Sequence, residues 1–136
     1  MSQENVDIVR QWWAGFNEEG LPPFDLCDER IEIRNPTDFP DAEVYRGHDG
    51  VRQWRVETFD RDMSVENVRV EIDDLIEAPD GEKVVMALRV LVRLKRFEMD
   101  HEMPWAAVWI IRHGKLVWAQ GYVHMADALE AAGLRE

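Results

Sequence analysis

Two side chains that could serve acid–base chemistry or ligand orientation, Asn35 and Asp38, lie on either side of Pro36. A carboxylate such as Asp38 can act as a general base where apolar surroundings raise its pKa. An asparagine cannot accept a proton at neutral pH, but its amide can orient a bound molecule. Asn35 and Asp38 are therefore the catalytic candidates, and a solvated turn carboxylate is the alternative for Asp38.

Other polar groups give weaker indications of chemistry. Asp100, His101 and Glu102 look like a metal or acid–base cluster, but along a strand His101 points away from the two carboxylates. His48 precedes a predicted helix, where a surface or capping role is usual. The sequence has no glycine-rich phosphate loop, no histidine pair at metal spacing and no activated serine or cysteine motif. No metal and no cofactor is expected.

Composition limits the classes of partner. The chain has 136 residues, 46% of them hydrophobic, which predicts one domain over 1–136. Its formal net charge of -12 disfavours nucleic acid and anionic membranes. The single cysteine, Cys27, cannot form an intramolecular disulfide, and neither a secretory signal nor a membrane span is evident. A cytoplasmic location is therefore predicted.

The elements that would position these residues follow from periodicity and turn signals. Apolar residues recur at helical spacing in the first and third helical segments, and alternate in the strand before Pro36. Residues 36–50 are predicted to be an irregular loop. The expected helices are 2–19, a short one through 24–27, 50–59 and 125–132, and the expected strands are 30–35, 64–76, 82–95, 97–112 and 115–124. This order, α-α-β-α-β-β-β-β-α, predicts an α+β fold.

Four stretches of sequence carry a family resemblance. They are ENVDIVRQWWAGFNEEG, YRGHDGVRQW, HGKLVWAQGYV and ADALEAAGL. Together they resemble the nuclear transport factor 2-like superfamily, in its SnoaL-like polyketide cyclase and ketosteroid isomerase-like branch. The resemblance covers nearly the whole chain as a single SnoaL-like domain. It implies a cone-shaped, curved, mixed but mainly antiparallel sheet with N-terminal helices on its concave face, and frequent dimerisation.

The resemblance does not extend to the chemistry of the family. The carboxylate base of ketosteroid isomerase matches Asn35, its helix tyrosine matches Trp12 and its strand aspartate matches Ala106. The cyclase acid–base aspartate matches Gly121 or Tyr122, depending on where the strand is counted from. The residues that perform the known reactions are therefore absent at the matching positions.

The predicted register of the final hairpin indicates which face of the sheet lines a pocket. A two-residue turn at His113 and Gly114 pairs Arg112 with Lys115, and counting back places small apolar side chains on one face. We assign that face to the concave side, where helices cover it and a ligand has room. The predicted ligand-binding residues are Trp12, Phe16, Asn35, Trp54, Ala106, Val108, Ala119, Gly121 and Val123.

The opposite face of the hairpin carries large rings. Its residues are Trp105, Trp109, Trp118, Gln120 and Tyr122. An exposed aromatic patch of this size typically marks a protein interface, so these residues predict a homodimer. The alternative is that the C-terminal helix or a long loop of the same chain covers them.

Three functions remain open on this evidence. One is a domain that binds a small apolar or aromatic molecule in the pocket. Another is a cofactor-independent isomerase, dehydratase or cyclase with a non-standard acid–base set. The last is a dimerisation module whose vestigial cavity is filled by its own side chains, and a cavity below ligand size would favour it.

Overall fold

The computed structural model describes residues 2–36, 44–62, 65–94 and 98–134. Its helices precede or flank a run of four consecutive strands, as expected of an α+β protein. The helical segments are α1 (Ser2–Glu19), a 3-10 turn (Phe24–Leu26), α2 (Gly47–Arg55), a π-helix that continues α2 (Val56–Asp62) and α3 (Met125–Ala131). The strands are β1 (Cys27–Arg34), β2 (Val44–Arg46), β3 (Val65–Glu77), β4 (Lys83–Leu94), β5 (Met99–Arg112) and β6 (Lys115–Tyr122).

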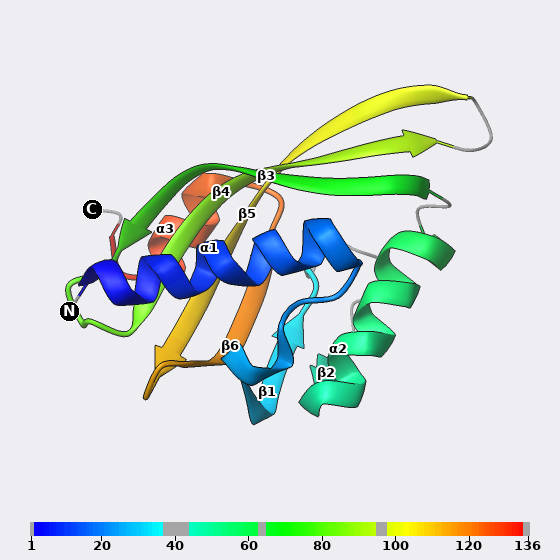
Figure 1. Ribbon diagram of the computed structural model, residues 1–136. Helices are drawn as coiled ribbons and strands as arrows, with labels where there is room; N and C mark the ends of the chain where they lie inside the picture. Colours follow the sequence, from blue (N-terminus) through cyan, green and yellow to red (C-terminus); the bar gives the residue numbers. More distant parts are fainter. Residues whose placement is uncertain (1, 37–43, 63–64, 95–97, 135–136) are drawn as a thin grey trace.

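The strands form one curved, unclosed sheet with the order β2-β1-β6-β5-β4-β3. Only the β1–β6 pair is parallel, and the other neighbours are antiparallel. In Figure 1, α1 crosses one face of the sheet while α3 lies behind the opposite face. The predicted mixed, mainly antiparallel α+β architecture is confirmed. We call the α1 face the inner face and the α3 face the outer face.

Glycines end the first and last helices where the chain must reverse. Gly20 has a φ of +82°, which favours glycine, and its N–H donates to the Phe16 carbonyl at 2.8 Å. Gly133, with a φ of +76°, follows α3 in the same way. The predicted ends of these two helices are therefore confirmed to within one residue.

Two predictions between β1 and β3 are wrong. The segment predicted as an irregular loop contains β2, a three-residue strand too short to show alternation in sequence. The helix predicted to begin at Gly50 begins at Gly47, so Asp49 lies within its first turn and pairs with Arg52 at 2.8 Å. Residues 37–43, which include Asp38, lie outside the described residues.

Two hydrophobic cores lie on the two faces of the sheet. On the inner face, rings of α1 and α2 pack against β1, β4 and β5. On the outer face, Ala128 and Ala132 pack against Val85, Ala106 and Val108. The sheet is therefore covered on both faces near β5 and β6, and the inner core is the larger.

Candidate functional site

Six aromatic rings form a cluster between α1 and the inner face of the sheet. The nearest ring centroids lie 4.7 Å apart and the furthest interacting pair 6.5 Å apart, mostly in edge-to-face or tilted geometry. All six side chains are buried, and they are Trp12, Trp13, Phe16, Trp54, Phe59 and Trp109. This ring cluster fills much of the space that the curved sheet encloses.

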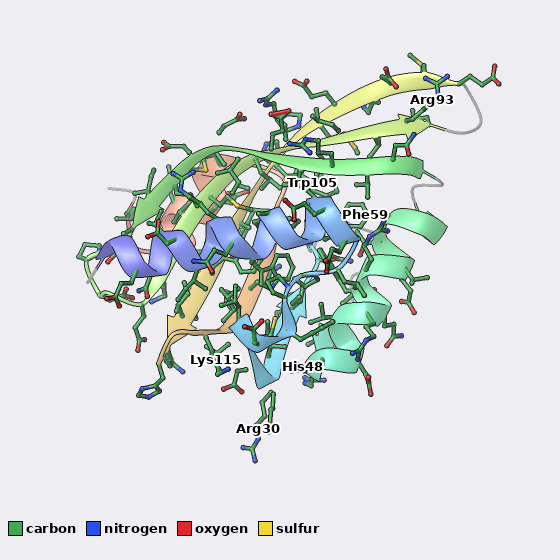
Figure 2. All side chains as sticks on the ribbon, in the orientation of Figure 1. Arg30, His48, Phe59, Arg93, Trp105 and Lys115 are labelled. Carbon is green, nitrogen blue, oxygen red and sulfur yellow. The ribbon has the colours of Figure 1, made fainter. Side chains whose placement is uncertain are left out.

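A small cavity of about 60 Å³ remains beside the ring cluster. Phe59 and Trp105, labelled in Figure 2 near the C-terminal end of α1, both line it. Aliphatic and small side chains complete much of the wall, among them Ile33, Met86, Leu88, Val90, Ala107 and Ala119. This volume can hold a molecule of a few non-hydrogen atoms, whereas drug-sized pockets have roughly 300–1,000 Å³.

A π-helical turn supplies one wall of the cavity. In Val56–Asp62, the adjacent residues Thr58 and Phe59 are both buried, and both line the cavity. Turns of this kind are rare in proteins, and those that occur are often found at functional sites. This turn was not predicted, because a π-turn has no distinctive residue pattern.

Asn35 lies at the end of β1 with its side chain held on two sides. The Trp54 indole donates to Asn35 Oδ1 at 3.1 Å, and Asn35 Nδ2 donates to the Thr58 hydroxyl oxygen at 3.1 Å. Gln120 Nε2 donates to the Asn35 main-chain carbonyl at 3.0 Å. The predicted candidate therefore borders the cavity, with its amide fixed by two neighbours.

Two buried indole groups lack a hydrogen-bond partner. Trp13 Nε1 and Trp109 Nε1 find no acceptor in the part of the chain that the structure describes, although both residues line the cavity. By contrast, Trp12 Nε1 donates to Cys27 Sγ at 3.2 Å. Burial raises the pKa of the Cys27 thiol, which keeps it in the uncharged form.

Charged groups are nearly absent from the cavity. Among the described lining residues there is no carboxylate, imidazole or thiol, and the one charged side chain is Arg34. Arg34 Nη2 pairs with Glu32 Oε2 at 2.7 Å, and this contact lowers the pKa of Glu32. The described side chains therefore offer hydrogen bonds to a bound molecule, but no group that exchanges a proton near neutral pH.

The predicted register of the final hairpin is wrong by one residue on β5. Arg112 does pair with Lys115, but a bulge follows, so that Ile111 pairs with Leu116 and Ile110 with Trp118. The extra residue, Val117, interrupts the alternation of β6, so that Ala119 and Gly121 share the inner face with Trp109 and Ala107 of β5 instead of with Val108 and Ala106.

The faces of individual residues change accordingly. Trp109 pairs with Ala119 and lies in the inner core, while Ala106 and Val108 pack in the outer core. Trp105 also packs against the inner core. The prediction that Trp105 and Trp109 face outward is therefore wrong, as is the inward orientation of Val108, whereas Ala106 packs in the outer core and also borders the cavity.

Other predicted positions lie where the sequence placed them or next to it. Cavity-lining residues from the predicted set are Trp12, Asn35, Trp54, Ala106, Ala119 and Gly121. Phe16 belongs to the ring cluster, and Val123 lies after the end of β6, half-buried. Trp118, Gln120 and Tyr122 share a strand face with Ile110, Val108 and Ala106 on β5.

The remaining polar candidates do not form a second site. His48 Nε2 lies 3.1 Å from the Cys27 carbonyl oxygen, away from the cavity. Asp100 and Glu102 pair with Arg93 and Arg89, on the strand face opposite His101. Within the described ranges, no group of three potential ligands could hold a metal ion, and no helix is long and apolar enough to cross a membrane.

Several lining residues were missed by sequence reasoning. They are Trp13, Ile33, Arg34, Pro36, Thr58, Phe59, Met86, Leu88, Val90, Trp105, Ala107, Trp109 and Gln120. The doublet of Trp12 and Trp13 was a usable signal, because adjacent rings on a helix cover a wide arc of its surface. The residues of β4 could not be found, because apolar side chains alternate on both of its faces.

Comparison with known proteins identifies the fold. An NTF2-like protein of unknown function from Burkholderia pseudomallei has a TM-score of 0.72 and 20% identity over 93% of this chain and 95% of its own. An epoxide hydrolase/cyclase-like enzyme of pyran ring formation in polyether salinomycin scores 0.69, with 18% identity over 88% and 90%.

A third solved structure adds a bound molecule. This protein from Catenulispora acidiphila has a ketosteroid isomerase-like fold and was crystallised in complex with trimethylamine. Its TM-score is 0.67, with 22% identity over 94% of this chain and 93% of that one. No family model and no curated protein matches the chain. These comparisons show that the chain has the NTF2-like fold.

Proposed function

We propose that this NTF2-like chain binds a small, compact and largely apolar molecule in the cavity beside its ring cluster. The observation that carries the proposal is a void of about 60 Å³ in a wall of indole rings and small aliphatic side chains. Such a wall gains binding energy from apolar contact, while a few fixed polar groups orient the occupant. Asn35, Trp54 and Thr58 form the fixed polar group here.

The cavity volume sets the size of the occupant. A molecule of a few non-hydrogen atoms fits without moving the rings, and a steroid or polyketide does not. The trimethylamine bound to the Catenulispora protein is of this compact size. The π-turn at Thr58 and Phe59 also supports a binding site, since such turns occur frequently at functional positions.

The test is a titration of the full chain with three compact molecules of similar size: isobutene, acetone and trimethylamine. Chemical shifts of the six tryptophan indole groups and of the methyl groups in the cavity wall report binding. We expect saturable shifts confined to cavity residues for at least one of the molecules. The proposal is wrong if none of the three gives saturable shifts.

The same volume favours a second candidate, a structural module whose interior is core and nothing more. Its ring cluster packs at centroid distances that leave little space between rings. This module would show no saturable shifts with any of the three molecules. The titration therefore separates the two functions directly.

An enzymatic function has less support among the described residues. Proton transfer needs a titratable group within hydrogen-bond reach of the occupant. The described wall has only the ion-paired Arg34, and Asn35 is fixed by Trp54 and Thr58. Asp38, the predicted base, lies outside the described residues.

Homodimerisation and a cytoplasmic location stay predictions. The aromatic patch that suggested a dimer is divided in the structure, because Trp105 and Trp109 lie on the inner face and α3 packs against Trp118 and Tyr122. Sedimentation velocity of the full chain measures the oligomeric state. A monomer at all concentrations would contradict the homodimer.

A further inference from the structure

Some polar groups around the cavity have hydrogen-bond partners and others do not. Among the described residues, three buried side-chain N or O atoms lack a partner: Trp13 Nε1, Trp109 Nε1 and Glu77 Oε2. The two nitrogen atoms belong to cavity-lining residues, whereas Glu77 does not line the cavity. A buried donor without an acceptor costs roughly 1–3 kcal/mol, so each indole favours an occupant that can accept its proton.

The two indoles lie close enough to share one occupant. The ring centroids of Trp13 and Trp109 are 5.8 Å apart, with the ring planes at 88°. Both residues border the same small cavity, so one compact molecule there can contact both. Any contact between one indole N–H and the face of the other ring is a weak interaction that leaves hydrogen-bond capacity unused.

Two side-chain acceptors in the cavity wall are already engaged. Asn35 Oδ1 accepts from Trp54, and the Thr58 hydroxyl oxygen accepts from Asn35. Gln120, which also lines the cavity, donates through Nε2 to the main-chain carbonyls of Asn35 and Gly121. The inner wall therefore offers mainly hydrogen-bond donors, namely two indole N–H groups and the Thr58 hydroxyl.

The charge of the wall excludes an anion as the preferred occupant. A buried carboxylate or phosphate needs a nearby cation to offset its desolvation. Arg34 pairs with Glu32 at 2.7 Å, and the chain carries a net charge of -12. A neutral acceptor oxygen needs no such partner and can still accept from the indoles.

We propose that the cavity selects a neutral molecule with a carbonyl-type acceptor oxygen, and that Trp13 and Trp109 donate to this oxygen through their indole N–H groups. This inference rests on the proposed binding function and specifies the chemistry of the ligand. Thr58 supplies a third donor, because its hydroxyl oxygen accepts from Asn35 while its O–H remains able to donate.

Acetone and isobutene test this inference, because they have similar size and shape. Acetone has a carbonyl oxygen at the position where isobutene has a methylene group. In ¹H–¹⁵N spectra of the full chain, acetone should move the indole protons of Trp13 or Trp109 downfield, as hydrogen-bond formation does. Isobutene should bind more weakly and give no downfield shift. The indole of Trp118, whose ring packs on the outer face, is the internal reference.

Single Trp→Phe variants measure the contribution of each donor. Trp13→Phe and Trp109→Phe keep a ring but remove the N–H, so each should weaken acetone binding by roughly three- to tenfold, the value of one hydrogen bond. Isobutene affinity should stay within twofold. The matched control, Trp118→Phe, removes an indole outside the cavity and should leave both affinities unchanged.

The outcomes separate this inference from the proposed function. If isobutene binds as tightly as acetone, the cavity binds ligands but does not select an acceptor, and the inference is wrong. The same conclusion follows if methyl groups of Met86 and Leu88 shift with acetone while both indole protons stay in place. If neither molecule binds, the proposed function itself fails. The wild-type spectra decide these points even if a variant does not fold.

Discussion

Asn35 shows how a single amide can position the polar part of a cavity wall. Its orientation is determined by Trp54, because an indole can only donate and must therefore meet the amide oxygen. The amide nitrogen is then directed to Thr58. The side chain thus ties β1 to α2 and to the π-turn, and it holds two residues of the cavity wall in fixed positions.

Replacing this amide should lower the stability of the fold. In Asn35→Ala, the Trp54 N–H is left buried without an acceptor, and we expect the free energy of unfolding to fall by about 2 kcal/mol. Urea denaturation measures the change. Asn5→Ala is the control, because the Asn5 amide donates to the Gly81 carbonyl at an exposed position and its loss should cost less than about 0.5 kcal/mol. Equal losses in the two variants would contradict the structural role given to Asn35.

At the scale of elements, the sequence predicted where helices and strands lie better than which way they face. Caps, turn glycines and apolar periodicity located α1, β1, α3 and the last four strands. The bulge at Val117 could not be predicted, because α3 covers the outer face and both faces of β5 are apolar. Alternation that would fix the register is therefore missing from this strand.

The cavity was predicted only in part for the same reason. Ala119 and Gly121 on β6 border it as expected. Trp12 and Trp54 were found from helical spacing. Trp109 and Trp105 were assigned to the outside, because the face with small apolar side chains was assigned to the pocket.

Neighbouring alanines on β5 test the observed register. Ala107 faces the inner core and borders the cavity, so Ala107→Leu should fill the void, abolish ligand-induced shifts and change stability by less than about 1 kcal/mol. Ala106 packs under α3, so Ala106→Leu should overpack the outer core and cost roughly 1–3 kcal/mol. Thermal and urea unfolding, with the isobutene titration, measure both effects. The reverse pattern would restore the register predicted from sequence.

Considered as a whole, the molecule buries apolar surface on both faces of one sheet. The inner face has the ring cluster and the cavity, while α3 closes the outer face over β5 and β6. Farther along the outer face, charged pairs replace apolar contacts. Arg89, for example, lies within 4 Å of carboxylate oxygens of Glu71, Asp73 and Glu102. The short C-terminal helix is therefore what separates the apolar part of the outer face from water.

Releasing α3 should make the chain self-associate. Ala128 is fully buried against the outer core, so Ala128→Asp places an unpaired carboxylate among apolar side chains and should detach the helix. The apolar surface at Val108 and Trp118 would then be exposed, and we expect sedimentation velocity to show species larger than those of the wild type. Ala126→Asp is the matched control, because Ala126 is exposed on the same helix and an acidic residue near a helix N-terminus is favourable. If Ala128→Asp sediments and unfolds like Ala126→Asp, α3 does not protect the outer face, and the aromatic residues of β6 are again available for contact with a second chain.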